Sequence, residues 1–231
     1  MQELAALLRK ETHTLHKQVE SSAFMKALLS GQVAKSAYVL LLRNLEPIYA
    51  ELEEGLTRHA NAPGISPIAM QPLFRLPNLH RDLHFLHGAL WFEELPQLGA
   101  CLAYINHLKA IQIRSPERLM AHAYVRYLGD LSGGQMLRQI VVQSLKLTDA
   151  NNGVDFYNFG ESHEVAALVK TFRLGLDQIG AAADGHTGTL VEEALVAFEL
   201  HVNLFHDLAR GCGLLPTQIQ NEPSIKSPQE H

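Results

Sequence analysis

The chain of 231 residues carries a formal net charge of −5, from 19 Lys and Arg against 24 Asp and Glu. This balance excludes a protein that attracts nucleic acid over its whole surface, because such binding needs a basic footprint. No apolar run approaches the ~20 residues of a membrane-spanning helix, and no basic start leads into an apolar leader. We therefore expect a cytoplasmic protein with no membrane anchor and no nucleic-acid partner.

Histidine is the unusual residue type, with 13 copies against the 2 cysteines Cys101 and Cys212. The cysteines lack the spacing of a metal or redox motif and need form no disulfide, which agrees with a reducing cytoplasm. The abundance of histidine raises the question of whether some of these side chains bind a metal or a cofactor.

Apolar residues recur at helical spacing along the whole chain. The first helix carries a stripe from Leu4 to Val19, and a later stripe runs from Val191 to Phe205. Residues 60–77 hold four prolines and a glycine and are expected to form a loop. No strand-like alternation persists. In chain order, the other helices are expected at about residues 36–56 (with a kink at Pro47), 79–90, 98–113, 116–147 (capped by Ser115), 162–179 and 187–210.

The pattern predicts an all-α protein with a single multi-helix domain over residues 1–215. The polar stretch that follows, residues 216–231, is expected to be a disordered tail, and two prolines fall within residues 218–231.

One predicted helix contains a cluster of glycines. Gly129, Gly133 and Gly134 lie among strong helix formers around Asp130, and each interior glycine costs about 0.5–1 kcal/mol relative to alanine. In one interpretation, Gly133 and Gly134 end a helix at a turn. In the other, the missing side chains let the backbone approach a flat ligand, with Gly129 and Gly133 on one face and Asp130 beside Gly134.

The run from Leu131 to Gln135 also matches the LSGGQ signature of ABC-type ATPases. Such an ATPase needs a phosphate-binding loop with a Gly-Lys dipeptide. The chain contains no Gly-Lys dipeptide and no strand pattern for a nucleotide-binding sheet. The ATPase interpretation is therefore excluded.

His16 lies on the first helix, four residues before Glu20 and seven after Arg9. A carboxylate one turn away can fix the tautomer of a metal-ligating imidazole, and Arg9 would lie two turns back, about 10 Å along the axis. This arrangement suits the iron and one propionate of haem. The alternative is an ordinary histidine on an amphipathic helix, beside a solvated carboxylate.

The other histidines give weaker patterns. His80, His84 and His87 share one helix face, but the chain has neither a Glu-x-x-His nor a His-Glu-x-x-His motif, so we expect surface or packing roles. Six further histidines form no group whose spacing indicates a function, namely His13, His59, His107, His163, His186 and His206.

Together these segments resemble the haem oxygenase family over residues 8–208. The most specific match runs from His122 to Gln135, through the glycine cluster, and a second match runs from Leu15 to Glu20. Shorter matches add Phe24-Met25, Gly31-Gln32-Val33, Ile48-Tyr49 and Leu52-Glu53-Glu54. The resemblance implies the family's fold, with haem held between the first helix and a kinked, glycine-rich distal helix.

The resemblance also implies roles for single residues. His16 matches the axial ligand of the haem iron, with Glu20 as its support, and Gly129 and Gly133 match glycines that let backbone lie over the haem. Asp130 matches a carboxylate that organises distal water. The same network would include Arg126, Tyr49 and Tyr104, and the haem propionates would meet Arg9, Tyr124 and Arg173.

Two positions depart from the family pattern. Some members have a lysine one turn before the propionate-binding arginine, where this chain has Val169, with Lys170 one place off. His201 stands where mammalian relatives have asparagine, so the water network is expected to differ.

The activity implied is cleavage of haem b at a meso carbon to biliverdin, CO and ferrous iron, with haem as both substrate and cofactor. O₂ and an external electron donor would be needed, so a ferredoxin or an NAD(P)H-dependent reductase is an expected partner. A haem carrier or sensor without turnover is the alternative, and a purely structural helical domain is a third possibility.

Overall fold

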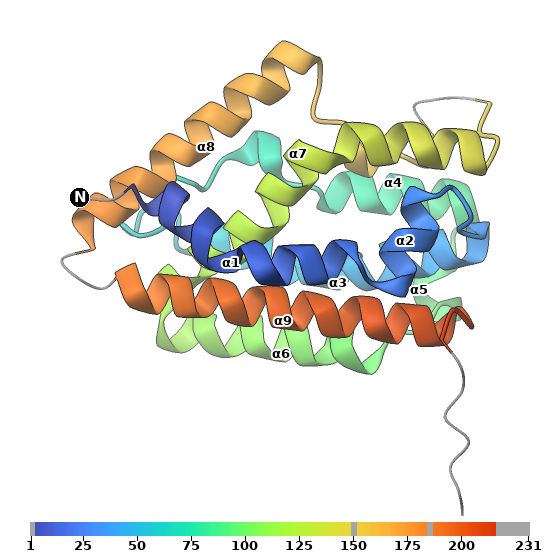
Figure 1. The fold of residues 1–231 in the computed structure, drawn as a ribbon, viewed down its shortest axis with the longest axis horizontal. Coiled ribbons are helices and arrows are strands. Elements are labelled where there is room, and N and C mark those ends of the chain that lie inside the picture. Colours follow the sequence, from blue (N-terminus) through green and yellow to red (C-terminus); the bar gives the residue numbers. More distant parts are fainter. Residues whose placement is uncertain (1–2, 149–151, 184–186, 216–231) are drawn as a thin grey trace, which may run out of the picture.

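The computed structural model describes residues 3–148, 152–183 and 187–215, and within these ranges the chain forms helices and no strand (Figure 1). This confirms the all-α prediction. The α-helices are α1 (Leu4–Glu20), α2 (Ala23–Leu29), α3 (Lys35–Arg58), α4 (Leu76–His87), α5 (Trp91–Glu94), α6 (Gly99–Arg114), α7 (Leu119–Ser144), α8 (Ser162–Ala182) and α9 (Thr187–Gly211); the short 3₁₀ turns are η1 (Gln71–Leu73), η2 (Pro116–Arg118) and η3 (Asp155–Tyr157).

The structure corrects several expected boundaries. The helix expected at 79–90 begins at Leu76 and ends at His87, because Gly88 follows with a φ of +116° that favours glycine. The helix expected from Pro116 begins there as a 3₁₀ turn, and the Ser115 side chain accepts no capping hydrogen bond. The helices α2 and α5 were not expected, and α3 continues through Pro47. The expected tail, residues 216–231, lies outside the described residues.

The long helices pack around α7 and α9. In Figure 1, α1 runs alongside α9, and α8 crosses the end of α1. Behind α1, the axis of α7 changes direction along its length while its helical hydrogen bonding continues. On the other side, α3 packs against α4 and α6. Among the described residues, no helix combines the length and the apolarity needed to cross a membrane.

The close approach of α8 depends on two glycines. A Cβ atom at Gly175 would lie 2.3 Å from the backbone oxygen of Pro67, and one at Gly180 would lie 2.6 Å from Cβ of Leu4. Neither position can carry a side chain without a shift of the backbone. The two glycines therefore allow α8 to pack directly against the 60–77 loop and the start of α1. This packing also determines the position of Arg173 on α8.

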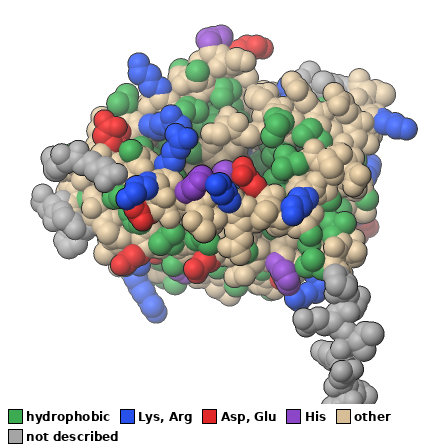
Figure 2. All heavy atoms as spheres, viewed as in Figure 1, with side chains coloured by type: hydrophobic (Ala, Val, Ile, Leu, Met, Phe, Trp, Pro, Cys, Tyr) green, Lys and Arg blue, Asp and Glu red, His purple; other side chains and the backbone are tan. Residues whose placement is uncertain are grey.

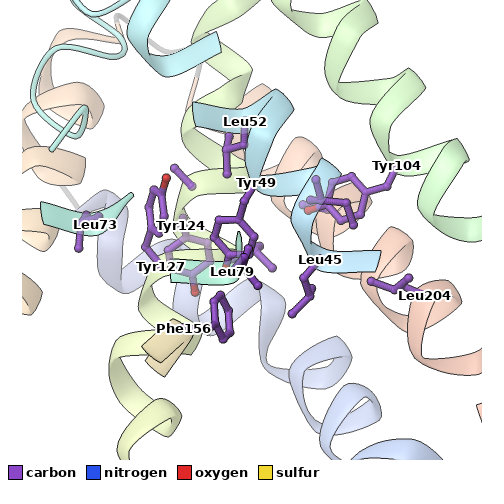
Figure 3. Packing of buried hydrophobic residues seen from close by; sticks show 14 of the residues in the cluster. Leu45, Tyr49, Leu52, Leu73, Leu79, Tyr104, Tyr124, Tyr127, Phe156 and Leu204 are labelled. Atoms are coloured by element: carbon purple, nitrogen blue, oxygen red, sulfur yellow. The ribbon is translucent and has the colours of Figure 1, made fainter. Parts of the chain in front are cut away.

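A buried carboxylate fixes the turn beneath the core aromatic residues. Asp82 on α4 accepts the backbone N–H groups of Asp155 at 2.9 Å and Phe156 at 2.7 Å. Phe156 then packs edge-on against Tyr49, with ring centroids 5.5 Å apart, and Figure 3 shows Tyr49 between Phe156 and Tyr127. The hydrogen bonds that Asp82 accepts from these two amides therefore hold Phe156 in place against Tyr49.

We expect Gly175→Ala to lower the free energy of unfolding of the haem-free protein by about 1–3 kcal/mol, because the new methyl group meets a backbone oxygen. Gly188→Ala is the matched control, since its Cβ would meet nothing within 4 Å at the start of α9, and alanine favours helix by about 0.5–1 kcal/mol. Denaturant unfolding measures both variants. Equal stability of the two would contradict the close approach of α8.

Candidate active site

The glycines of α7 do not end the helix. The helix is continuous from Leu119 to Ser144, so the interpretation of a turn at Gly133 and Gly134 is wrong. A Cβ at Gly129 or Gly133 would meet nothing within 4 Å, whereas one at Gly134 would lie 3.3 Å from the ring of Tyr157. Gly129 and Gly133 thus offer bare backbone to open space, as expected for a ligand surface, while Gly134 makes room for a buried tyrosine.

Asp130 lies at the centre of a buried hydrogen-bond network. The hydroxyl of Tyr49 donates to Oδ2 of Asp130, and Nη2 of Arg126 donates to Oδ1 at 3.1 Å. Arg126 also donates to the Tyr49 hydroxyl, from Nε at 3.0 Å and from Nη2 at 2.8 Å. The structure therefore brings together Asp130, Arg126 and Tyr49 from α7 and α3.

Burial controls the protonation of this network. Loss of water contact raises the pKa of Asp130, against the opposing effects of Arg126, the Tyr49 hydroxyl and Arg75. It also raises the pKa of Tyr49 well above its ordinary value, so the phenol stays protonated and acts as a donor to Asp130.

His201 extends the network to α9. Nη1 of Arg126 lies 2.5 Å from Nε2 of His201, and because a guanidinium can only donate, this imidazole nitrogen accepts. Burial first, and the charge of Arg126 second, lower the pKa of His201 well below its ordinary value. The histidine at this position is therefore neutral, and it binds Arg126 directly.

Tyr104 belongs to a neighbouring group of side chains. Its hydroxyl lies 3.1 Å from Nδ1 of His122, and its ring stands edge-on to His201 at 6.5 Å between centroids. Among the described contacts it makes no hydrogen bond to Asp130 or Arg126. Tyr104 thus contacts the Asp130 network through the ring of His201 and not through a direct hydrogen bond.

His16 is accessible on α1. Its side chain is 52% exposed, and Nδ1 lies 3.6 Å from Oε1 of Glu20. Its ring stands edge-on to Phe198 of α9, 6.0 Å between centroids. Figure 2 shows histidine, basic and acidic side chains together over α1 near the centre of this face. The Glu20 carboxylate thus lies beside Nδ1 of His16 on the surface, at a distance longer than a hydrogen bond.

The predicted propionate-binding residues lie on three helices, with Arg9 on α1, Tyr124 on α7 and Arg173 on α8. The Tyr124 hydroxyl lies 3.2 Å from Oγ1 of Thr12, which links α7 to α1 one turn before His16. Burial raises the pKa of Tyr124, while the hydrogen bond with Thr12 and the charges of Arg9 and Arg173 oppose that rise. Both arginines are exposed, and so is Lys170 on α8.

The sequence interpretation missed a buried cluster on the far side of Tyr104. Nε2 of His107 and Nε2 of His122 lie 2.6 Å and 2.9 Å from Oε1 of Glu193, and Nη1 of Arg118 donates to Oε2 at 3.0 Å. Burial raises the pKa of Glu193, but the bonds from His122 and His107 outweigh it and bring the pKa to about 2. Helical spacing cannot reveal this cluster, because its members come from α6, α7, α9 and η2.

The histidines of α4 are surface residues, as expected. His80 pairs with Glu46 at 3.0 Å and packs on Trp91, and His87 pairs with Glu94 at 2.8 Å. In the described ranges, the one group of three or more side chains that could hold a metal ion is instead His107, His122 and Glu193.

Comparison with known proteins places this chain in a family. The profile of the Heme oxygenase family matches residues 2–207. Heme oxygenase 1 of Nostoc is 37% identical over 206 residues, covering 89% of this chain and 85% of that protein. Human Heme oxygenase 1 is 33% identical over 208 residues, covering 90% of this chain and 72% of that protein.

Solved structures agree. The crystal structure of heme oxygenase-2 from Synechocystis, in complex with heme and NO, superimposes with a TM-score of 0.86 at 33% identity, covering 91% of this chain and 87% of that one. Heme oxygenase from Leptospira interrogans gives a TM-score of 0.82 at 32% identity, covering 88% and 98%. From the match of the profile, the sequence and the fold over most of the length, this chain belongs to the haem oxygenase family.

Proposed function

We propose that this member of the family binds haem between α1 and α7 and cleaves it at a meso carbon to biliverdin, CO and ferrous iron. The observation that carries the proposal is the bare, open backbone at Gly129 and Gly133, directly beside the buried Asp130 network. The Synechocystis relative was solved with haem, which supports the same ligand here. When bound, haem supplies the iron that activates O₂ and the porphyrin ring that is opened.

His16 is the proposed axial ligand. Its half-exposed imidazole can be reached by a planar ligand, and the Glu20 carboxylate near Nδ1 favours the tautomer that leaves Nε2 free to coordinate. Phe198, edge-on to the ring, limits its rotation.

Asp130 is proposed to hold water on the opposite face and to pass protons through it. Tyr49 and Arg126 engage its oxygens and so fix the carboxylate, and each oxygen keeps a lone pair for a water molecule. The glycines put no side chain in the way of that water. Proton transfer by a positioned group contributes roughly 10²–10⁴-fold to the rate of a reaction.

Arg9, Arg173 and Tyr124 are proposed to bind the two propionates. Arginine forks match carboxylates in geometry as well as charge. Because the three groups come from α1, α8 and α7, they would fix the rotation of the ring, and with it the meso carbon that faces Asp130.

The reaction also needs O₂ and electrons from outside the chain, and we propose a ferredoxin or an NAD(P)H-dependent reductase as donor. A cytoplasmic location is proposed as well. It is supported by the free thiols of Cys101 and Cys212 and by the net charge of −5.

Asp130→Asn tests the proton-transfer role. It keeps the size of the side chain and removes its charge, so haem should still bind one to one while biliverdin formation slows about 100-fold or more. Absorption titration measures binding, and chromatography measures the pigment. A variant that forms biliverdin at the rate of the unmodified protein would refute the role.

His16→Ala tests the axial ligand. We expect the ferric absorption spectrum to change and turnover to stop, with partial recovery on addition of imidazole. His13→Ala is the matched control, because His13 is also exposed on α1. A native spectrum in His16→Ala would mean that another residue is the ligand.

Arg173→Glu tests the propionate contacts. Reversal of one charge should weaken haem binding about tenfold, the equivalent of about 1.4 kcal/mol, and alter the distribution of biliverdin isomers. Lys170→Glu makes the same reversal at an exposed site less than one turn earlier and should leave the isomers unchanged. If both variants behave alike, α8 contributes only positive charge to haem binding, and Arg173 makes no specific propionate contact.

A further inference from the structure

The cluster of His107, His122 and Glu193 is separate from the proposed haem site, and its donor atoms converge. Two imidazole nitrogens lie at 2.6 Å and 2.9 Å from the same carboxylate oxygen, and the ligand atoms of the three residues all lie within 4.8 Å of one another. His122 and Glu193 are almost fully buried, whereas 30% of the His107 side chain is exposed.

This set of donors is that of a divalent transition-metal site. Two imidazoles and a carboxylate, with an open position for water, are common ligands of Zn²⁺ and related ions. Around a tetrahedral ion with bonds of about 2.05 Å, ligand atoms lie about 3.3 Å apart. The two observed nitrogen–oxygen separations are shorter by less than about 1 Å, and the partly exposed ring of His107 can supply the movement.

Arg118 completes the arrangement. It donates to Oε2 of Glu193 at 3.0 Å and leaves Oε1 to the two histidines. A basic partner on the second oxygen orients a ligating carboxylate, as hydrogen-bond partners of metal ligands generally do. The surface pairs His80–Glu46 and His87–Glu94 each offer a single histidine, so they lack this convergence.

We propose that His107, His122 and Glu193 bind one divalent first-row transition-metal ion, such as Zn²⁺, where α6, α7 and α9 meet. The exposed edge of His107 is the entry path, and water occupies the fourth position. An ion held there connects three helices, two of which, α7 and α9, carry the partners Arg126 and His201.

Occupancy reverses a hydrogen bond next to the distal network. Without the ion, Nε2 of a neutral His122 must carry the proton, because the Glu193 carboxylate it faces can only accept, and Nδ1 then accepts from the Tyr104 hydroxyl. With the ion on Nε2, that proton lies on Nδ1 and is donated to Tyr104. The Tyr104 hydroxyl is then free to donate elsewhere, beside the ring of His201. The site is thus a switch for the direction of one hydroxyl group.

Co²⁺ and Zn²⁺ titrations of the haem-free full chain test the site. We expect one equivalent of Co²⁺ with the visible absorption of a four-coordinate ion, displaced by Zn²⁺. His107→Ala should weaken binding at least tenfold and abolish the rise in melting temperature that Zn²⁺ gives the unmodified chain. Because His107 is partly exposed, this variant should remain folded, which circular dichroism checks.

Two matched variants separate this cluster from the other histidines. His87→Ala removes a surface His–Glu pair and His16→Ala removes the proposed haem ligand, and both should bind Co²⁺ as the unmodified chain does. Binding lost in either of these but kept in His107→Ala, or no binding at all, would overturn the proposal. Nitrogen NMR of the His122 ring should show the proton on Nδ1 with Zn²⁺, and a proton that stays on Nε2 would refute the switch.

Discussion

The site depends on an arginine that is buried between three acceptors. Arg126 is 6% exposed and donates to Asp130, Tyr49 and His201, which come from α7, α3 and α9. A buried guanidinium is tolerable only when its donors are satisfied, and removal of one partner leaves a charge without compensation at a cost of about 3–5 kcal/mol. The same bonds therefore hold the helices in register and fix the carboxylate on which the proposed chemistry relies.

Beside this polar centre, the proposed ligand surface consists of backbone that carries no side chains. Gly129 and Gly133 face open space, while the ring of Tyr157 occupies the space beside Gly134. Three glycines in six positions thus serve the proposed binding of haem and the packing of Tyr157. The cost in helix propensity is offset by the core on the other side of α7, where residues such as Tyr127 are fully buried.

The sequence alone was sufficient for the longer helices and for part of the site. It located α1, α3, α4, α6, α7, α8 and α9, whereas α2 and α5 are too short to show a periodic pattern. The family resemblance selected Asp130, Arg126 and Tyr49, which the fold brings together. It missed the cluster around Glu193, because contacts between residues 71 and 86 positions apart have no local signal.

The two walls of the proposed haem site are held by different interactions. Buried hydrogen bonds of Arg126 tie α7 to α3 and α9, whereas α1 packs along α9, shares the Thr12–Tyr124 pair with α7 among the described hydrogen bonds, and carries His16 half exposed. The proposed catalytic carboxylate is therefore held in place from within the core, while the proposed iron ligand on α1 is open to a ligand that arrives from solvent.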